Sequence, residues 1–195
     1  MEEKEKLERR RQIFHLLLGT VIVILYKAGI LTINILFLIF LVGFAASFVS
    51  FKHKIPGIRW FLKRFERKED FEKSPGKGSL MYLAGVLATL LLFEENTALA
   101  AIMVLAVGDS VSHMVGKYFG KRRMRTAKHV EGTIAGIFFA SITASLFVKP
   151  TLAIIGSTAA MLTEAVELRI GKVMLDDNLI IPLIAGLAIH LANLL

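Results

Sequence analysis

Apolar stretches of nearly membrane-spanning length alternate with short polar segments along most of the chain. A helix needs about 20 apolar residues to cross a bilayer, and somewhat fewer when it is short. The pattern therefore predicts an all-α polytopic membrane protein with about seven transmembrane helices. The predicted spans cover residues 12–28, 32–51, 78–93, 97–115, 132–148, 151–168 and 179–195.

The polar segment 52–77 has a pattern of its own. Apolar side chains, among them Trp60 and Phe65, recur at approximately helical spacing between lysines and arginines, and Ser74-Pro75-Gly76 ends the run. Such a pattern is typical of an amphipathic helix that lies in the headgroup region of a membrane. We therefore predict one amphipathic helix in this segment.

The distribution of basic residues predicts the orientation. All 24 lysines and arginines except Lys27 and Lys149 lie in the N-terminal segment or in loops 52–77, 116–131 and 169–178. Basic loops are retained in the cytoplasm. We therefore expect a cytoplasmic N-terminus, three cytoplasmic loops and a C-terminus outside, in a plasma or ER-type membrane.

The composition narrows the classes further. With 55% hydrophobic residues, the chain is expected to form a single integral membrane domain over residues 1–195. It contains no cysteine, which excludes disulfides, thiolate catalysis and zinc–thiolate sites. Membrane orientation and anionic headgroups explain the net charge of +8, so no nucleic-acid partner is expected.

The candidate catalytic and binding residues are concentrated in residues 108–133, which carry an acid near each end, Asp109 and Glu131. An ionisable residue at membrane depth marks a functional site by default. Carboxylates suit a hard divalent metal, and cations suit the phosphates that such a metal bridges. The segment therefore indicates a phosphate-handling site at a membrane surface. Six cations lie between the acids: Lys117, Lys121, Arg122, Arg123, Arg125 and Lys128.

Each acid of this segment has a structural alternative. Asp109 is a candidate magnesium ligand, with Gly108 allowing close approach, or a structural acid bonded to Ser112 or His113. Glu131 is a candidate second metal ligand or a helix cap. All these roles remain open at the level of sequence.

The cations divide in the same way. Lys117 and Lys128 lie closest to the two acids and are candidate phosphate contacts. Arg123 and Arg125 are expected to be ordinary positive-inside residues. His15, in the first predicted span, is expected to be a buried structural residue rather than a base.

A second group of acids follows in the C-terminal part. Glu164 lies in an otherwise apolar stretch. Asp176, Asp177 and Asn178 precede the last predicted span, where one of them is expected to cap the helix and adjacent acids are suited to complete a metal site.

In order along the chain, these residues resemble the signature of the CTP-dependent lipid kinases. That family includes dolichol kinases, phytol kinases and CTP-dependent diacylglycerol kinases, and it is related to the CDP-diacylglycerol synthases. The chain departs from the pattern at His113 and His129, and it lacks the carboxy-terminal metal motif of the synthases, which favours a kinase. The matching residues are Arg10, Phe14-His15, Lys77-Gly78-Ser79, Gly108-Asp109-Ser110, Gly116-Lys117, Phe119-Gly120, Lys128, Glu131-Gly132-Thr133, Glu164, Asp177-Asn178-Leu179 and Ile181-Pro182.

The resemblance implies transfer of a phosphoryl group from CTP to a membrane lipid alcohol, with Mg²⁺ as cofactor. Glu164 or an acid at 176–177 would accept the proton of the lipid hydroxyl. The implied catalytic residues are Asp109, Glu131, Lys128 and Glu164, and the implied metal ligands are Asp109, Glu131 and Asp177. The implied nucleotide-binding residues are Gly108, Ser110, Gly116, Lys117, Arg122, Lys77, Gly132, Thr133 and Asn178.

Several alternatives stay open. Dolichol or another polyprenol is the first expected substrate, because segment 128–133 resembles that branch, and phytol, geranylgeraniol or diacylglycerol is the alternative. A CTP-using cytidylyltransferase that makes a CDP-lipid is the alternative enzyme, and a small proton-coupled transporter is the non-enzyme alternative. Gly132 and Gly136 offer a small-residue face for helix packing, which leaves a homo-oligomer open.

Overall fold

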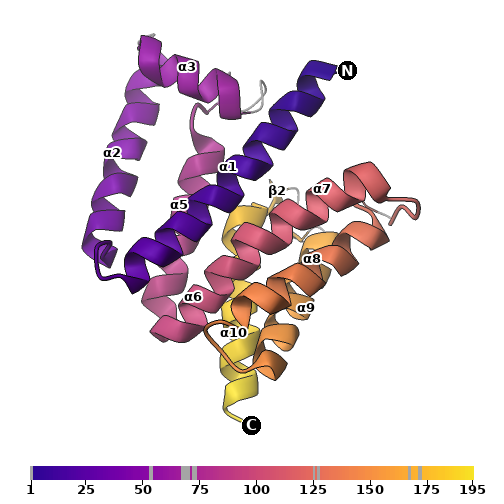
Figure 1. The fold of residues 1–195 in the computed structure, drawn as a ribbon. Helices are drawn as coiled ribbons and strands as arrows, with labels where there is room; N and C mark the ends of the chain where they lie inside the picture. The colour runs from indigo at the N-terminus through magenta and orange to yellow at the C-terminus, as the bar shows by residue number, and fades with distance from the viewer. Residues whose placement is uncertain are drawn as a thin grey trace.

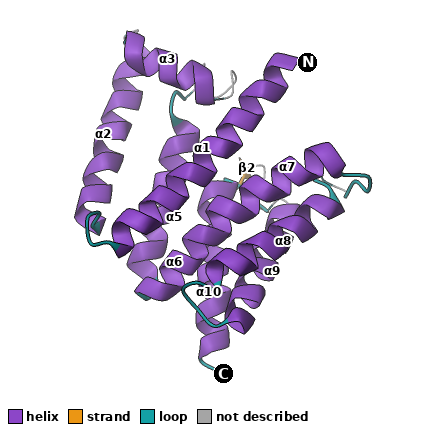
Figure 2. Ribbon diagram, viewed as in Figure 1, coloured by secondary structure: helices purple, strands orange, loops and turns teal. Residues whose placement is uncertain are grey.

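The computed structural model describes residues 2–52, 55–66, 71, 74–124, 126, 128–166, 168–170 and 173–195. Apart from loops and one short hairpin, the described residues are helical, which confirms the all-α class (Figures 1 and 2). The helices are α1 (Glu2–Lys27), α2 (Ile33–Lys52), α3 (Pro56–Phe65), α5 (Lys77–Leu92), α6 (Glu95–Met103), the π-helix η1 (Val104–Asp109), α7 (Ser110–Phe119), α8 (Val130–Ala144), α9 (Pro150–Val166) and α10 (Asp177–Asn193). The hairpin pairs β1 (Arg169–Ile170) with β2 (Val173–Met174).

One continuous rod of helix, formed by α6, η1 and α7, runs through the centre of the molecule. Its first half consists of small and medium apolar residues on every face, as expected of a helix that is surrounded by others. Every residue from Thr97 to Ser110 is buried. Helices α1, α8, α9 and α10 pack around η1 (Figure 1), so the core forms where the rod is most apolar.

Two helical segments among the described residues are long and apolar enough to cross a membrane, Ile33–Ser50 and Glu95–Phe119. Only 6% of the first segment is buried inside the molecule, whereas 72% of the second is buried. The remaining apolar helices, α5, α8, α9 and α10, have 15 to 17 residues. The predicted count of seven spans is therefore not confirmed, because several predicted spans included loop residues that do not continue the helix.

The structure also describes the N-terminal segment and most of the polar segment 52–77. The charged N-terminal residues and the first predicted span form a single 26-residue helix, α1. In segment 52–77 the structure places the amphipathic helix α3, with Leu62 buried and Trp60 61% exposed. The buried Glu66 side chain accepts a hydrogen bond from the backbone N–H of Gly76 at 2.8 Å, which ties the end of α3 to the start of α5.

Two close helix contacts through glycine position the segments that carry the candidate residues. A Cβ atom on Gly85 of α5 would lie 2.1 Å from the backbone oxygen of Asn178 in α10. A Cβ atom on Gly132 of α8 would lie 2.4 Å from the backbone oxygen of Ser112 in α7. Only glycine permits the backbones to approach so closely. These contacts therefore fix α10 against α5 and α8 against α7.

Candidate active site

Asp109 is the last residue of the π-helical turn η1, and its side chain is only 8% exposed. Short π-helical turns inside α-helices occur frequently at functional sites, because the extra residue re-aims the side chains that follow. The next residue, Ser110, donates a hydrogen bond through Oγ to the backbone oxygen of Gln12 in α1 at 3.1 Å. Helix α1 therefore contacts the rod of α6, η1 and α7 at the residue that follows Asp109.

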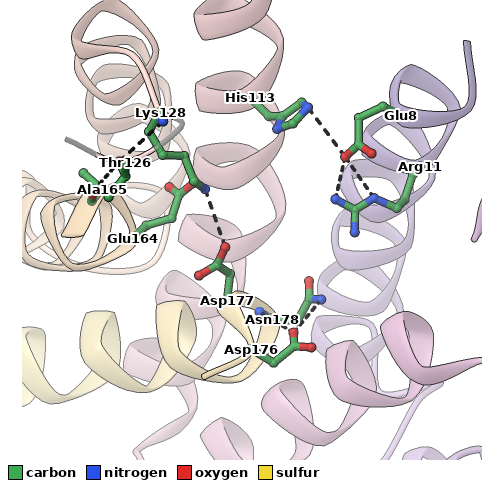
Figure 3. Close-up of polar contacts among 10 residues, drawn as sticks. All are labelled: Glu8, Arg11, His113, Thr126, Lys128, Glu164, Ala165, Asp176, Asp177 and Asn178. Atoms are coloured by element: carbon green, nitrogen blue, oxygen red, sulfur yellow. Dashed lines mark hydrogen bonds and ion pairs between the residues drawn. The ribbon is translucent and has the colours of Figure 1, made fainter. Parts of the chain in front are cut away.

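Lys128 lies at the centre of a group of acids drawn from three separate segments (Figure 3). It belongs to the loop between α7 and α8, and its ammonium forms an ion pair with Glu164 in the last turn of α9. The same ammonium lies 3.5 Å from Oδ2 of Asp177, the first residue of α10. The fold thus brings together residues 36 and 49 positions apart in sequence.

The electrostatics add Asp109 to this group. Burial lowers the pKa of the Lys128 ammonium, but three neighbouring carboxylates outweigh burial and raise that pKa above its ordinary value. These carboxylates belong to Glu164, Asp109 and Asp177. Three acids and one ammonium give this group a formal excess of negative charge, and two of the acids, Glu164 and Asp177, pair directly with Lys128. We call Asp109, Lys128, Glu164 and Asp177 the acidic cluster.

Hydrogen bonds of the described residues on either side of Lys128 hold it beside the acids of the acidic cluster. The backbone N–H of Met124 donates to the oxygen of Lys128 at 3.0 Å, and the N–H of Val130 donates to the oxygen of Arg122 at 3.0 Å. The hydroxyl of Thr126 donates to the backbone oxygen of Ala165 at 2.9 Å (Figure 3). This bond fastens the loop to the end of α9, next to Glu164.

The acids at the start of α10 have separate roles. Asp176 is the N-cap of α10: its Oδ1 accepts hydrogen bonds from the backbone N–H and the side-chain amide of Asn178 at 3.1 and 3.0 Å. An N-cap satisfies a backbone donor that has no partner within the helix. Asp177, the next residue, extends toward Lys128 instead (Figure 3). One acid therefore fixes the helix and the other belongs to the acidic cluster.

Glu131 is engaged elsewhere. Its carboxylate accepts a hydrogen bond from the backbone N–H of Arg122 at 3.2 and 3.3 Å to its two oxygens. Hydrogen bonds from backbone N–H groups, its own first and then those of Arg122 and Lys121, hold the pKa of the Glu131 carboxyl below its ordinary value. Within the ranges that the structure describes, no three acids or histidines form a preformed metal site.

The other predicted binding residues lie in several places. Lys117 and Arg122 are exposed, and the Lys117 ammonium lies 5.5 Å from the centre of the Tyr118 ring. Lys77 is exposed at the start of α5. Arg123, expected to be a positive-inside residue, is also exposed, and the prediction for Arg125 falls outside the described residues.

The predicted glycines and hydroxyl residues take part in helix packing. Gly116 and Gly132 meet between α7 and α8, where a Cβ atom on Gly132 would lie 2.9 Å from the Cα atom of Gly116. Gly108 faces Met161, whose Sδ would lie 3.0 Å from an added Cβ atom. Thr133 Oγ1 donates to the backbone oxygen of His129 at 3.3 Å. These positions shape the segments around the acidic cluster.

Two features near the site were not predicted from the sequence. The buried side-chain oxygen of Gln12 has no hydrogen-bond partner among the described residues; its only signal is that it is the sole glutamine of the chain. His113 Nε2 lies 3.5 Å from Oε1 of Glu8, which also pairs with Arg11 at 2.6 Å (Figure 3). That contact joins α7 to α1, so His113 faces the N-terminal helix.

Comparison with known proteins gives two relatives. The chain is 31% identical to the uncharacterized protein MJ1137 of Methanocaldococcus jannaschii, over 92% of this chain and 91% of the relative. It is 25% identical to CTP-dependent diacylglycerol kinase 1 of Schizosaccharomyces pombe, over 62% of this chain and 62% of that kinase. No protein-family model matches the chain. No solved structure gives a significant match.

The alignment with MJ1137 covers nearly the full length of both chains. The alignment with the fission-yeast protein is shorter, but the name of that protein states an activity. The protein therefore belongs to the same family as MJ1137 of Methanocaldococcus jannaschii, and its distant similarity to the fission-yeast kinase supports the wider family of CTP-dependent lipid kinases.

Proposed function

We propose that this protein phosphorylates a membrane lipid alcohol with CTP as the phosphoryl donor. The observation that carries the proposal is the acidic cluster, in which the Lys128 ammonium pairs with Glu164 and Asp177 from two other segments and the Asp109 carboxylate adds to the negative charge that acts on it. The distant similarity to a CTP-dependent diacylglycerol kinase supports it. Apolar, exposed helices such as α2 are consistent with a substrate that resides in a bilayer.

Magnesium is the cofactor that this chemistry requires. Mg²⁺ commonly binds through one or two protein carboxylates plus the phosphates of a nucleotide. Asp109 and Asp177 provide such oxygens beside an excess of negative charge, so we propose that they hold the metal. When bound, Mg²⁺ neutralises charge on the triphosphate. Glu131 belonged to the predicted ligand set, but its bond to Arg122 suits a role in holding the loop.

The chain's own residues position and stabilise the reacting groups. Phosphoryl transfer asks the protein mainly for positioning and for neutralisation of developing charge. Lys128 is held charged by its neighbours, so it is suited to stabilise the transferring phosphoryl group. Glu164, with a side chain 2% exposed, fixes the Lys128 ammonium as a positioning residue. Asp177, with a side chain 41% exposed, is the more accessible of the two acids that pair with Lys128, which suits its proposed role as a metal ligand.

The proposed topology places this chemistry next to the cytosol. The distribution of basic residues puts the N-terminus and the loop that carries Lys128 on the cytoplasmic side, and the C-terminus outside. CTP would then arrive from the cytosol and the lipid from the bilayer. The shorter helices α5, α8, α9 and α10 would complete the seven predicted spans by tilt or local thinning of the bilayer.

Two classes of lipid alcohol are candidates for the substrate. Dolichol or another polyprenol is the first candidate from the sequence pattern. Diacylglycerol is the second candidate, and the specific observation in its favour is the activity named for the fission-yeast relative. Both classes carry a primary or secondary hydroxyl next to long hydrocarbon chains, so the same site chemistry serves either one.

The test uses purified protein in detergent with CTP labelled at the γ or the α phosphate. Dolichol, phytol and diacylglycerol are supplied in turn, with and without EDTA. A kinase transfers only the γ label to lipid and stops when EDTA removes the metal. Transfer of the α label would show a cytidylyltransferase instead.

Asp109→Asn provides the matched variant because it preserves the shape of the side chain and removes its charge. We expect it to lower phosphorylation at least roughly a hundredfold, the scale of losing one electrostatic contact in a transition state, with an unchanged melting temperature. Arg123→Gln, at an exposed position outside the acidic cluster, should retain activity. Full activity of Asp109→Asn would refute the metal-binding role.

A further inference from the structure

A groove of about 410 Å³ lies between α2 and α5, apart from the acidic cluster. Its volume falls in the range of roughly 300–1,000 Å³ that is usual for small-molecule sites. The walls are apolar: α2 contributes Phe40, Phe44 and Phe48, and α5 contributes Leu80, Met81 and Ala84. Such walls suit a hydrocarbon chain.

The polar groups of the groove are confined to one end. Ser47, Ser74 and Lys77 line it near the C-terminal end of α2 and the N-terminal end of α5. There the hydroxyl of Ser47 donates to the backbone oxygen of Pro75. Phe40 and Ala84 lie toward the other ends of the same two helices. A groove that is cationic at one end and apolar along its length matches an amphiphile with a polar or anionic head.

The groove lies at the exposed edge of the molecule. Helix α2 is one of the two candidate membrane spans, and only 6% of its apolar segment is buried. It packs against α5, touching it where Gly43 meets Leu80, and more lightly against α3 (Figure 1). Because α2 stands at the edge of the molecule, a lipid reaches the groove sideways between α2 and the rest of the bundle.

Helix α5 lies between the groove and the proposed reaction site, and its contact with α10 is at the level of the apolar end of the groove. Ala84 lines the groove, and the next residue, Gly85, packs directly against the backbone oxygen of Asn178. Asn178 follows Asp177 of the acidic cluster. One side of α5 therefore faces the groove and the neighbouring side supports the helix end that carries Asp177.

We propose that the groove between α2 and α5 binds the hydrocarbon chain of the lipid alcohol, with Lys77 at the end that receives the head of the lipid. This inference rests on the proposed function for the identity of the lipid. It assigns to α2 the role of a wall that selects substrates by their chains. It also gives Lys77 a contact with the lipid head or its new phosphate in place of a contact with CTP.

The absence of native cysteine makes a reversible test available. Met81→Cys places a single thiol in the middle of the groove, and an octyl methanethiosulfonate attached to it fills the space until a reducing agent removes it. We expect the attached chain to raise the KM for the lipid by roughly tenfold or more, since lost contact with only two methylene groups has that effect. The KM for CTP should not change, and reduction should restore the original value.

Ala45→Cys is the control, because Ala45 is exposed on α2 and does not line the groove. The same octyl group at that position should leave both KM values unchanged. The inference would be overturned if the octyl group had equal effects at the two positions. It would also be overturned if the KM for the lipid were unchanged when the octyl group is attached to Met81→Cys. Either result would leave the kinase activity itself intact.

Binding is measured separately so that the two proposals fail independently. A dolichol or diacylglycerol analogue with a diazirine on its chain is photolysed with the purified protein in the absence of CTP, and the labelled residues are identified by mass spectrometry. Labels on α2 and α5 within the groove, displaced by excess lipid alcohol but not by phosphatidylcholine, support the inference even if no phosphoryl transfer occurs. Labels elsewhere, or equal displacement by phosphatidylcholine, overturn it, the latter because the groove then holds a structural lipid.

Discussion

The ion pair between Lys128 and Glu164 allows stability to be separated from catalysis. The Glu164 side chain is 2% exposed and the Lys128 side chain is 19% exposed. Lys128→Met keeps most of the hydrocarbon stem of the lysine but removes the charge that faces Glu164. A buried carboxylate would then remain without its partner, and removal of one partner from a buried pair destabilises a protein by about 3–5 kcal/mol.

The second acid near Lys128 changes this figure little. Asp177 lies 3.5 Å from the ammonium, but its side chain is 41% exposed. Water can solvate it when Lys128 is absent, so its loss of pairing is expected to contribute under about 1 kcal/mol. For a chain of 195 residues, the total corresponds to a fall in melting temperature of roughly 6–20 °C. Nearly all of the fall in melting temperature should therefore come from the unpaired Glu164 carboxylate.

The double variant Lys128→Met/Glu164→Gln tests that assignment. Replacing the carboxylate with a neutral amide removes the unpaired charge, so we expect at least half of the lost melting temperature to return. Phosphoryl transfer should remain absent in both variants, because the proposed phosphate contact is missing from each. Melting is followed in one detergent, and transfer is followed with γ-labelled CTP.

Lys149→Met is the control, because Lys149 is exposed and lies outside the acidic cluster; its melting temperature should stay within a few degrees of the original. If Lys128→Met melts like the unmodified protein, the pair does not contribute as its burial indicates. If the double variant is as unstable as the single one, the cost arises from packing of the lysine stem rather than from an unpaired charge.

Two further predictions concern the contacts that hold the site in place. Gly85→Ala should destabilise the protein by about 1–3 kcal/mol and reduce phosphoryl transfer by roughly a hundredfold, since the added Cβ atom would lie 2.1 Å from the backbone oxygen of Asn178. Gly78→Ala on the same helix is the control: nothing lies within 4 Å of its added Cβ atom, so neither stability nor transfer should change. Equal effects of the two substitutions would contradict the role of the contact between Gly85 and Asn178. Tyr82→Phe should lower stability by about 0.5–1.5 kcal/mol because the buried Tyr82 hydroxyl donates to the backbone oxygen of His15 at 3.0 Å. Tyr118 is exposed, so Tyr118→Phe should leave the melting temperature unchanged. A lower melting temperature for Tyr118→Phe alone would refute this assignment.

The helical class followed from the apolar pattern, but the number of spans did not. A run of apolar residues does not record where a helix ends, so the turn residues 145–148 were counted as part of a span. The charged residues at the start of the chain and the first apolar segment form one helix, α1, because Lys, Glu and Arg are good helix formers. Sequence therefore indicated how many apolar segments exist better than how long each helix is.

The candidate acids could be named from the sequence, but the sequence did not show which of them lie together. Asp109, Glu164 and Asp177 were candidates because an acid in or beside an apolar segment is costly to bury. Glu131 had the same appearance in sequence, yet its carboxylate bonds to the backbone of Arg122. The direction of a side chain at a helix start depends on the loop that precedes it, and the local pattern does not encode that loop's course.

The sequence by itself determined the chemical inventory of this protein: apolar helices, basic segments between them, no cysteine, and a small set of acids in or beside apolar segments. Only the tertiary structure decided that Lys128 meets Glu164 and Asp177 from three segments, and that α2 and α5 enclose an apolar groove. The physical reason is that hydropathy and charge are properties of single residues. The meeting of side chains from separate segments depends instead on close contacts between backbones that are far apart in sequence, such as those at Gly85 and Gly132.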